Sequence, residues 1–246
     1  MPGLSAVILA AGKGTRMKSD KAKVLHELLS RPMIHYVLEA VSELGVREPV
    51  VVIGHQAGRV EQALAGFPCR FVYQAEQKGT GHAVRQAESA LGGKSGNILI
   101  VCGDTPLLSS RTLRSLAAEE NALLVTELED PFGYGRIIRS PEGYVERVVE
   151  EKDADPAVKL IKEINAGAYC LNTRALFKAL KEIGTDNRQG EYYLTDAVQI
   201  LSDKGIKLKA VTTDDPQEIK GINDCQQLAL AEEILRSRLS RIIRES

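Results

Sequence analysis

Short apolar runs alternate with amphipathic segments through the first half of the chain. The runs have the length and branched side chains of β-strands, and the apolar character of residues 5–10 and 49–54 is typical of strands buried on both faces. They are residues 5–10 (SAVILA), 49–54 (PVVVIG), 70–73 (RFVY) and 97–102 (NILIVC). Residues 32–44, 58–64 and 81–91, which lie between or beside them, are predicted to be helical. Strands alternating with helices predict an α/β fold with a doubly wound, mostly parallel sheet.

Three polar loops follow predicted strands of this sheet. They are GKGT (12–15), the loop that begins at Gln74, and GDTP (103–106). Right-handed crossovers place the carboxyl ends of parallel strands along one edge of a sheet. We therefore expect the three loops to converge on a single ligand crevice.

The second half of the chain has a different pattern. A turn-rich segment, PFGYGRI (131–137), leads into two strand-like segments, 136–139 and 144–150, that can pair antiparallel. The remaining predicted elements are a strand at 164–171, a helix at 192–204, a strand at 207–212 and an amphipathic helix at 224–244. The pattern predicts a small antiparallel subregion attached to the main sheet, with no linker-like tract between them.

Charge and cysteine content exclude several classes of function. The 246 residues include 32 Lys and Arg against 33 Asp and Glu, and a net charge of -1 gives no electrostatic case for nucleic acid or an anionic membrane as partner. The 4 cysteines lack zinc-ligand spacing and are expected to be reduced thiols. The first apolar run is too short to cross a membrane and no basic segment precedes it, so we expect a cytoplasmic protein.

The first loop has the composition of a phosphate site. Gly12 and Gly14 allow backbone N–H groups to approach an anion without a Cβ in the way, and Arg16 and Lys23 add positive charge. The segment lacks the third glycine of GxGxxG and does not match the P-loop pattern GxxxxGK[ST]. From this loop alone, phosphate binding and a tight turn with solvated charges both stay open.

The loop at Gln74 offers groups that suit a nucleobase. The Gln74 amide can both donate and accept, and Gly79 and Thr80 precede a helix whose first N–H groups are free. The alternative is a helix start capped by Thr80. We expect His82, on the helix that follows, to be structural.

Several oxygen-bearing side chains could hold a cation or a sugar. Asp104 directly follows a buried strand, where it is either a ligand for a hard cation or a turn residue. Asn223 is either a helix N-cap or a second oxygen ligand. Glu150 and Asn165 lie on strand-like segments and supply the kind of hydrogen-bonding groups that a sugar ring needs.

Together these segments resemble one family. LAAGKGTRM (9–17), followed by Lys23, is similar to the signature of sugar-nucleotide pyrophosphorylases. Nearly the whole chain resembles the N-terminal domain of the bifunctional bacterial N-acetylglucosamine-1-phosphate uridyltransferases. The matching stretches, in the same order, are SDKAKVLHEL, YQAEQKGTGHAV, GDTPLL, DPFGYGRI, VVEEKDA, EINAG, QGEYYLTD and GIND.

The resemblance implies a Rossmann-like sheet of the nucleotide-diphospho-sugar transferase type and a role for each matching residue. Those implied to contact the nucleotide are Leu9, Ala10, Ala11, Gly12, Gln74, Gly79, Thr80, Cys102 and Gly103. Those implied to surround the amino sugar are Gly135, Glu150, Asn165, Tyr193 and Thr195. Arg16, Lys23 and Asp104 are implied to be catalytic, and Asp104 and Asn223 are implied to coordinate Mg²⁺.

The implied reaction transfers a uridylyl group from UTP to N-acetylglucosamine 1-phosphate, giving UDP-N-acetylglucosamine and pyrophosphate, as a step toward peptidoglycan and lipopolysaccharide. One alternative keeps the chemistry but uses glucose, mannose or glucosamine 1-phosphate, and another is a nucleotide-binding module without turnover. A dinucleotide-dependent oxidoreductase is disfavoured because Gly54 stands where an acidic residue would end the second strand.

The chain departs from the family pattern at a few positions and in length. Ala22 replaces the usual proline before Lys23, Ala166 replaces a frequent threonine, and Cys102 replaces a frequent aromatic residue. The resemblance divides the chain into a nucleotidyltransferase domain, 1–223, and a connecting helix, 224–246. No hexapeptide repeat follows, so we expect no β-helix domain, no acetyltransferase activity, and a monomer or weak homo-oligomer.

Overall fold

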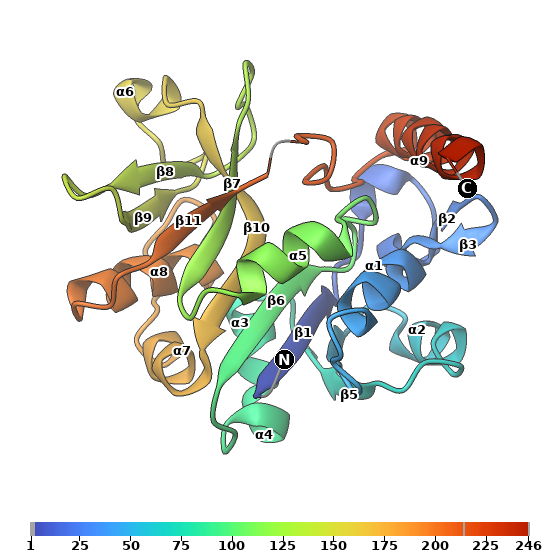
Figure 1. Cartoon of the computed structure of the whole chain (residues 1–246). Helices are drawn as coiled ribbons and strands as arrows, with labels where there is room; N and C mark the ends of the chain where they lie inside the picture. The colour runs from blue at the N-terminus through green and yellow to red at the C-terminus, as the bar shows by residue number, and fades with distance from the viewer. Residues whose placement is uncertain (1–2, 214, 246) are drawn as a thin grey trace.

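A nine-stranded sheet lies at the centre of the computed structural model, which describes residues 3–213 and 215–245 (Figure 1). Its strands are β1 (Leu4–Ala10), β4 (Val50–Ile53), β5 (Arg70–Tyr73), β6 (Asn97–Cys102), β7 (Ala122–Glu127), β8 (Arg136–Arg139), β9 (Val145–Val149), β10 (Glu163–Asn172) and β11 (Lys209–Thr212). The main path runs β11-β7-β10-β6-β1-β4-β5. Only β10 runs antiparallel to its neighbours on this path, so the predicted mostly parallel sheet is confirmed.

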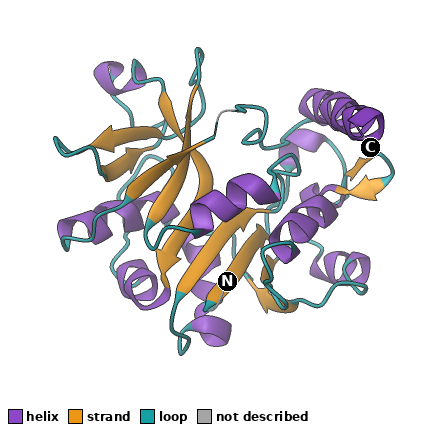
Figure 2. Cartoon of the chain, viewed as in Figure 1, coloured by secondary structure: helices purple, strands orange, loops and turns teal. Residues whose placement is uncertain are grey.

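Helices cover both faces of the sheet (Figure 2). They are α1 (Met33–Ser42), α2 (Ala57–Ala63), α3 (Thr80–Gln86), α4 (Glu88–Leu91), α5 (Ser110–Ala117), α6 (Pro156–Lys159), α7 (Thr173–Leu180), α8 (Leu194–Asp203) and α9 (Cys225–Glu245), with short 3-10 turns η1 (Thr15–Met17) and η2 (Lys23–Leu25). Side chains of α1, α2 and α5 pack in one apolar core, and side chains of α3, α4, α7 and α8 pack in the other. This is the doubly wound arrangement that the alternating pattern predicts.

Strand β1 needs apolar residues at successive positions because its side chains enter both cores. Ile8 and Ala10 point into the core beneath α1, while Val7 points into the core beneath α3. All three side chains are almost fully buried. A polar residue at any of these positions would lose its water without gaining a partner, because successive residues of a strand face opposite sides.

The direction of winding reverses beside β1. From β1 the chain passes through α1 to β4 and then to β5 on one side, and it returns through α3 and α4 to β6 on the other. The loops that follow β1 and β6 therefore leave a crevice between them. Ligands of doubly wound sheets bind at such a switch point.

The antiparallel subregion and the C-terminal helix lie on opposite flanks of this edge (Figure 1). The β8–β9 hairpin joins the sheet through a pairing of Arg136 with Ile164 of β10. Helix α9 packs against the short β2 (Glu27–Leu28), which forms a hairpin with β3 (Arg31–Pro32). A small apolar cluster there includes Leu28, Leu107 and Ala231.

Sequence patterns missed several elements, among them β7, α5, α6, α7 and the β2–β3 hairpin. The boundary between residues 223 and 224 stays a prediction, and residues 1, 2, 214 and 246 lie outside the described residues. Among the helices that the structure describes, none combines the length and apolar character needed to cross a membrane.

Candidate active site

A hollow of about 260 Å³ opens at the switch point of the sheet. Its walls include most of the residues expected to contact a nucleotide, namely Leu9, Ala10, Ala11, Gly12, Gln74, Gly79, Thr80 and Cys102, together with Lys23 and Asp104. Gly103 lies just behind the wall, where its N–H donates to Leu9 O at 2.9 Å. The three predicted loops therefore do converge, as the strand order requires.

The two glycines of the first loop differ in their surroundings. A Cβ on Gly12 would meet no atom within 4 Å. Gly14 has a left-handed backbone, with φ 65 and ψ 43, and a Cβ there would lie 2.6 Å from Lys23 Cβ. Gly14 is thus required by the turn that brings Lys23 to the hollow, whereas Gly12 leaves space open toward a ligand.

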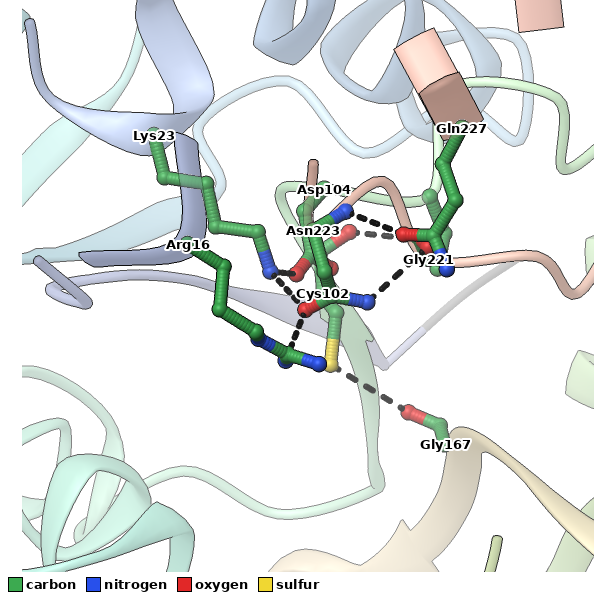
Figure 3. Close-up of polar contacts among 9 residues, drawn as sticks. Arg16, Lys23, Cys102, Asp104, Gly167, Gly221, Asn223 and Gln227 are labelled. Carbon is green, nitrogen blue, oxygen red and sulfur yellow. Dashed lines mark hydrogen bonds and ion pairs between the residues drawn. The ribbon is translucent and has the colours of Figure 1, made fainter. Parts of the chain in front are cut away.

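Four side chains from distant parts of the chain meet beside the hollow (Figure 3). Lys23 Nζ donates to Asp104 Oδ2 and, at 2.7 Å, to Asn223 Oδ1. Arg16 Nη2 donates to the same Asn223 oxygen at 2.7 Å. Two cationic groups therefore share two oxygen acceptors at this point.

The loop that carries Asn223 is fixed by its neighbours. The N–H of Ile222 donates to Asp104 O at 2.9 Å, and the amide Nδ2 of Asn223 donates to Gly221 O at 3.0 Å. The N–H of Asn223 donates to Gln227 Oε1, on the first turn of α9, at 2.6 Å. These bonds leave the side-chain Oδ1 of Asn223 facing Lys23 and Arg16 (Figure 3).

A larger depression of about 1130 Å³ adjoins the first hollow. Arg16 and Glu150 line it, and Glu191 lines both spaces. Glu150 Oε1 accepts a 2.9 Å hydrogen bond from Thr195 Oγ1. A Cβ on Gly135 would lie 2.7 Å from Val148 Cγ1 and 3.4 Å from Glu150 Oε2, so the packing of Val148 excludes a larger residue beside the carboxylate.

The other residues expected around the sugar are less directly placed. The backbone N–H of Asn165 donates to Gly135 O at 2.8 Å. Its side-chain amide donates to Tyr169 Oη at 2.6 Å. Tyr193 is buried and lines neither space among the described residues; its hydroxyl accepts from Gln189 Nε2 at 2.7 Å.

Residues 187–193, called the strap here, connect the two spaces. The N–H of Tyr192 donates to Lys78 O at 2.8 Å, and Tyr192 O accepts from the N–H of Gly81 at 2.8 Å. Gly79 has φ 108, and a Cβ on it would lie 2.5 Å from Tyr192 O. Only glycine allows the strap and the loop that begins at Gln74 to approach this closely.

Burial changes the acidity of several groups at the site. Burial, together with the nearby Asp104 charge and against the charge of Lys23, raises the pKa of the Cys102 thiol to about 12, so Cys102 is a neutral residue of the wall. Burial also raises the pKa of Glu150, against the hydrogen bond from Thr195 that favours the carboxylate; Asp196 and Asp153 add to the upward shift.

Sequence reasoning missed three residues that the structure brings to the site. Gln77 and Glu191 line the first hollow, and both fall in stretches that carry the family resemblance, YQAEQKGTGHAV and QGEYYLTD. No sequence pattern indicated Gln227, because its contact with Asn223 depends on the turn that precedes α9.

A doubly wound sheet with a glycine-lined, cationic hollow at its switch point is typical of α/β proteins that bind nucleotide phosphates. The family description that matches residues 6–199 is a MobA-like NTP transferase domain, and the chain belongs to this family. A solved nucleotidyl transferase from Methanothermobacter thermautotroptrophicus has the same fold, with a TM-score of 0.67 and 25% identity over 96% of this chain and 100% of that one.

Curated relatives are more similar in sequence. The bifunctional protein GlmU of Halalkalibacterium halodurans is 51% identical over 241 residues, which cover 96% of this chain and 53% of that protein. The bifunctional protein GlmU of Geobacter metallireducens is 48% identical over 98% of this chain and 52% of its own length. The chain thus spans about half the length of the curated relatives it matches.

Proposed function

We propose that the chain transfers a uridylyl group from UTP to N-acetylglucosamine 1-phosphate and releases pyrophosphate. The observation that carries this proposal is the convergence of Arg16, Lys23, Asp104 and Asn223 beside the glycine-lined hollow. The matching sequence stretches supply the identities of the base and the sugar.

In the proposed reaction, a phosphate oxygen of the sugar 1-phosphate attacks the α-phosphorus of UTP in line. The bond from the α-phosphorus to the oxygen that bridges to the β-phosphorus breaks, and pyrophosphate leaves with that oxygen. The attacking oxygen is already anionic at neutral pH, so no general base is needed. The protein has to bring two anions together and neutralise the developing charge, which Arg16 and Lys23 are positioned to do.

The residues at the site fit a divalent cation. Asp104 and Asn223 offer a carboxylate and an amide oxygen, both hard ligands, and the Lys23 ammonium already contacts both oxygens as a cation would. Bound Mg²⁺ supplies positive charge that offsets the repulsion between the two phosphates. The chain's own part is to hold the two oxygens in place, through Ile222 and Gln227.

We assign the larger depression to the amino sugar. Glu150 presents its carboxylate there beside Gly135, and Thr195 holds one of its oxygens. Arg16, which lines the same space, links the sugar region to the cationic cluster. We also propose a cytoplasmic location and a monomer or weak homo-oligomer, with no nucleic acid or membrane as partner.

The test is an assay of pyrophosphate release from purified chain, Mg²⁺, UTP and N-acetylglucosamine 1-phosphate. Glucose, mannose and glucosamine 1-phosphate, tested in parallel, distinguish the sugars. Asp104→Ala is expected to abolish turnover in a folded protein, whereas Asp203→Ala, which removes an exposed carboxylate from α8, is the matched control. Full turnover in Asp104→Ala would refute the cation assignment, and no pyrophosphate from any sugar would refute the proposed function.

A further inference from the structure

The residue before Lys23 has the backbone of a proline but keeps its N–H. Ala22 has φ -54 and ψ 137, and this φ lies within the narrow range that a proline ring allows. Ala22 also stands where the family pattern usually has proline. The residue is completely buried, so its backbone N–H needs a hydrogen-bond partner within the protein.

The side chain of Gln56 supplies that partner. Its Oε1 accepts from the N–H of Ala22 at 3.0 Å, and its Nε2 donates to Asp20 O. Both partners are backbone groups, one of which can only donate and the other only accept. They therefore fix which end of the Gln56 amide faces which partner. The side chain thus bridges residues 20 and 22, immediately before Lys23.

Gln56 itself has an unusual backbone conformation. With φ 52 and ψ 37 it lies in the left-handed region, which favours glycine and which other residues seldom adopt. It stands at the start of α2, where its carbonyl accepts from Val60 N at 3.2 Å, and α2 packs beside η2. Glycine would adopt this backbone more easily, so the Gln56 side chain must contribute something that outweighs the strain.

The bridge restrains the backbone from which the Lys23 side chain leaves. Ala22 O accepts from Leu25 N at 2.9 Å and so closes the η2 turn that contains Lys23. With its N–H bonded to Gln56 and its carbonyl bonded to Leu25, Ala22 is fixed at both of its peptide groups. The direction of the Lys23 side chain follows from this backbone, and its ammonium group reaches both oxygen acceptors of the site.

We infer that Gln56 is a positioning residue for Lys23, because its side chain restrains the preceding peptide as a proline ring at position 22 would. Proline has no N–H, and its Cδ would take the place of the hydrogen that now faces Gln56 Oε1. The ring and the bridge are therefore alternative ways to impose the same backbone. The inference rests on the proposed function only for the phosphates that Lys23 meets.

Hydrogen exchange in the ligand-free chain, followed by NMR, tests the bridge itself. Gln56→Gly should speed exchange of the Ala22 N–H by about three- to ten-fold, the range for loss of one hydrogen bond. Ser30→Gly is the control, because Ser30 is exposed and left-handed, with φ 62, in the turn between β2 and β3. It relieves the same kind of strain and should leave Ala22 unchanged. Equal exchange at Ala22 in Gln56→Gly and in the unmodified chain would overturn the inference.

Ligand binding separates the positioning of Lys23 from general damage to the hollow. Gln56→Gly should weaken binding of Mg²⁺–UTP, measured by calorimetry, by about three- to ten-fold. Binding of uridine, measured by NMR titration, should not change, because uridine has no phosphate for Lys23 to meet. A purely structural defect would weaken both ligands alike. An equal loss for the two ligands, or no loss for UTP, would therefore count against the inference.

A double-mutant cycle with Ala22→Pro tests whether the ring and the bridge are equivalent. In the Ala22→Pro background, Gln56→Gly should change UTP affinity by less than about two-fold, because the ring already restrains the backbone. Losses that simply add would contradict the equivalence. If the proline variants do not fold, the exchange and the UTP-to-uridine comparison decide the matter without them. An unmodified chain that binds no UTP would refute the proposed function, while exchange at Ala22 would still show whether Gln56 restrains this peptide.

Discussion

Replacing Gly12 with alanine separates ligand binding from folding. No protein atom lies within 4 Å of the added Cβ, and Gly12 does not have a left-handed backbone. The substitution should therefore leave the fold intact and, by restricting the unfolded chain, raise the free energy of unfolding by about 0.4–1 kcal/mol. The same methyl group would lie at the wall of the hollow where the phosphates are proposed to bind.

The size of the binding defect follows from the bond at risk. A hydrogen bond between a backbone N–H and a phosphate is charge-assisted and contributes about 1.5–3 kcal/mol. At about 1.4 kcal/mol per factor of ten, Gly12→Ala should weaken UTP binding roughly ten- to hundred-fold. Calorimetric titration with Mg²⁺–UTP measures the affinity, and thermal unfolding without ligand measures the stability.

Gly14 in the same loop gives the opposite result. An alanine there must adopt φ 65 and press against Lys23 Cβ at 2.6 Å, so Gly14→Ala should lower stability by about 1–3 kcal/mol. At this chain length, each kcal/mol lowers Tm by roughly 2–4 °C. Gly143→Ala, with φ 86 and open space, controls for backbone strain alone. Equal loss of Tm in Gly12→Ala and Gly14→Ala, or UTP affinity unchanged in Gly12→Ala, would refute the reasoning.

Three further predictions concern charged side chains. Lys23→Met should increase the affinity of the nucleotide-free chain for Mn²⁺, because the ammonium group no longer occupies the oxygens of Asp104 and Asn223. Electron paramagnetic resonance measures this affinity, and an unchanged value would contradict the assignment of these oxygens to a cation. Burial raises the pKa of Glu150, so this carboxyl group binds a proton more tightly in the folded protein than in the unfolded chain. The protein therefore loses stability as the pH rises above about 4.5, and Glu150→Gln should raise Tm at pH 8 but not at pH 4. Arg238→Met removes a 2.6 Å bond to Leu107 O and should lower the free energy of unfolding by about 1 kcal/mol, a loss that chemical denaturation would detect.

The sequence predicts the parallel part of the fold because its strands are continuous apolar runs. β1 and β4 can be recognised without tertiary information, since a short run of mostly branched apolar residues is typical of a strand covered on both faces. The antiparallel direction of β10 is different. Its position between β6 and β7 is decided by the return of the chain from the β8–β9 hairpin, and residues 163–172 carry no local sign of it.

The residues of the site also differ in whether the local sequence or the tertiary packing determines their position. Gly12 and Asp104 closely follow β1 and β6, so the fold class alone brings them together, whereas Lys23 reaches them through the turn at Gly14. Asn223 comes from the far end of the chain, and its side chain faces Lys23 only because Gln227 fixes its N–H. Such a contact depends on how α9 packs, which no periodicity in residues 224–244 specifies.

The oxygens that the chain offers are too few to hold Mg²⁺ alone. Within the described residues no three His, Cys, Asp or Glu side chains gather as a metal site, and Asp104 and Asn223 supply one carboxylate and one amide. Mg²⁺ prefers six oxygens and in nucleotide enzymes takes several from substrate phosphates. Because Lys23 already pairs with the Asp104 carboxylate, and Lys23 and Arg16 both donate to Asn223 Oδ1, a cation gains little until phosphates draw these side chains away. Cation and nucleotide should therefore bind cooperatively, each providing what the other lacks.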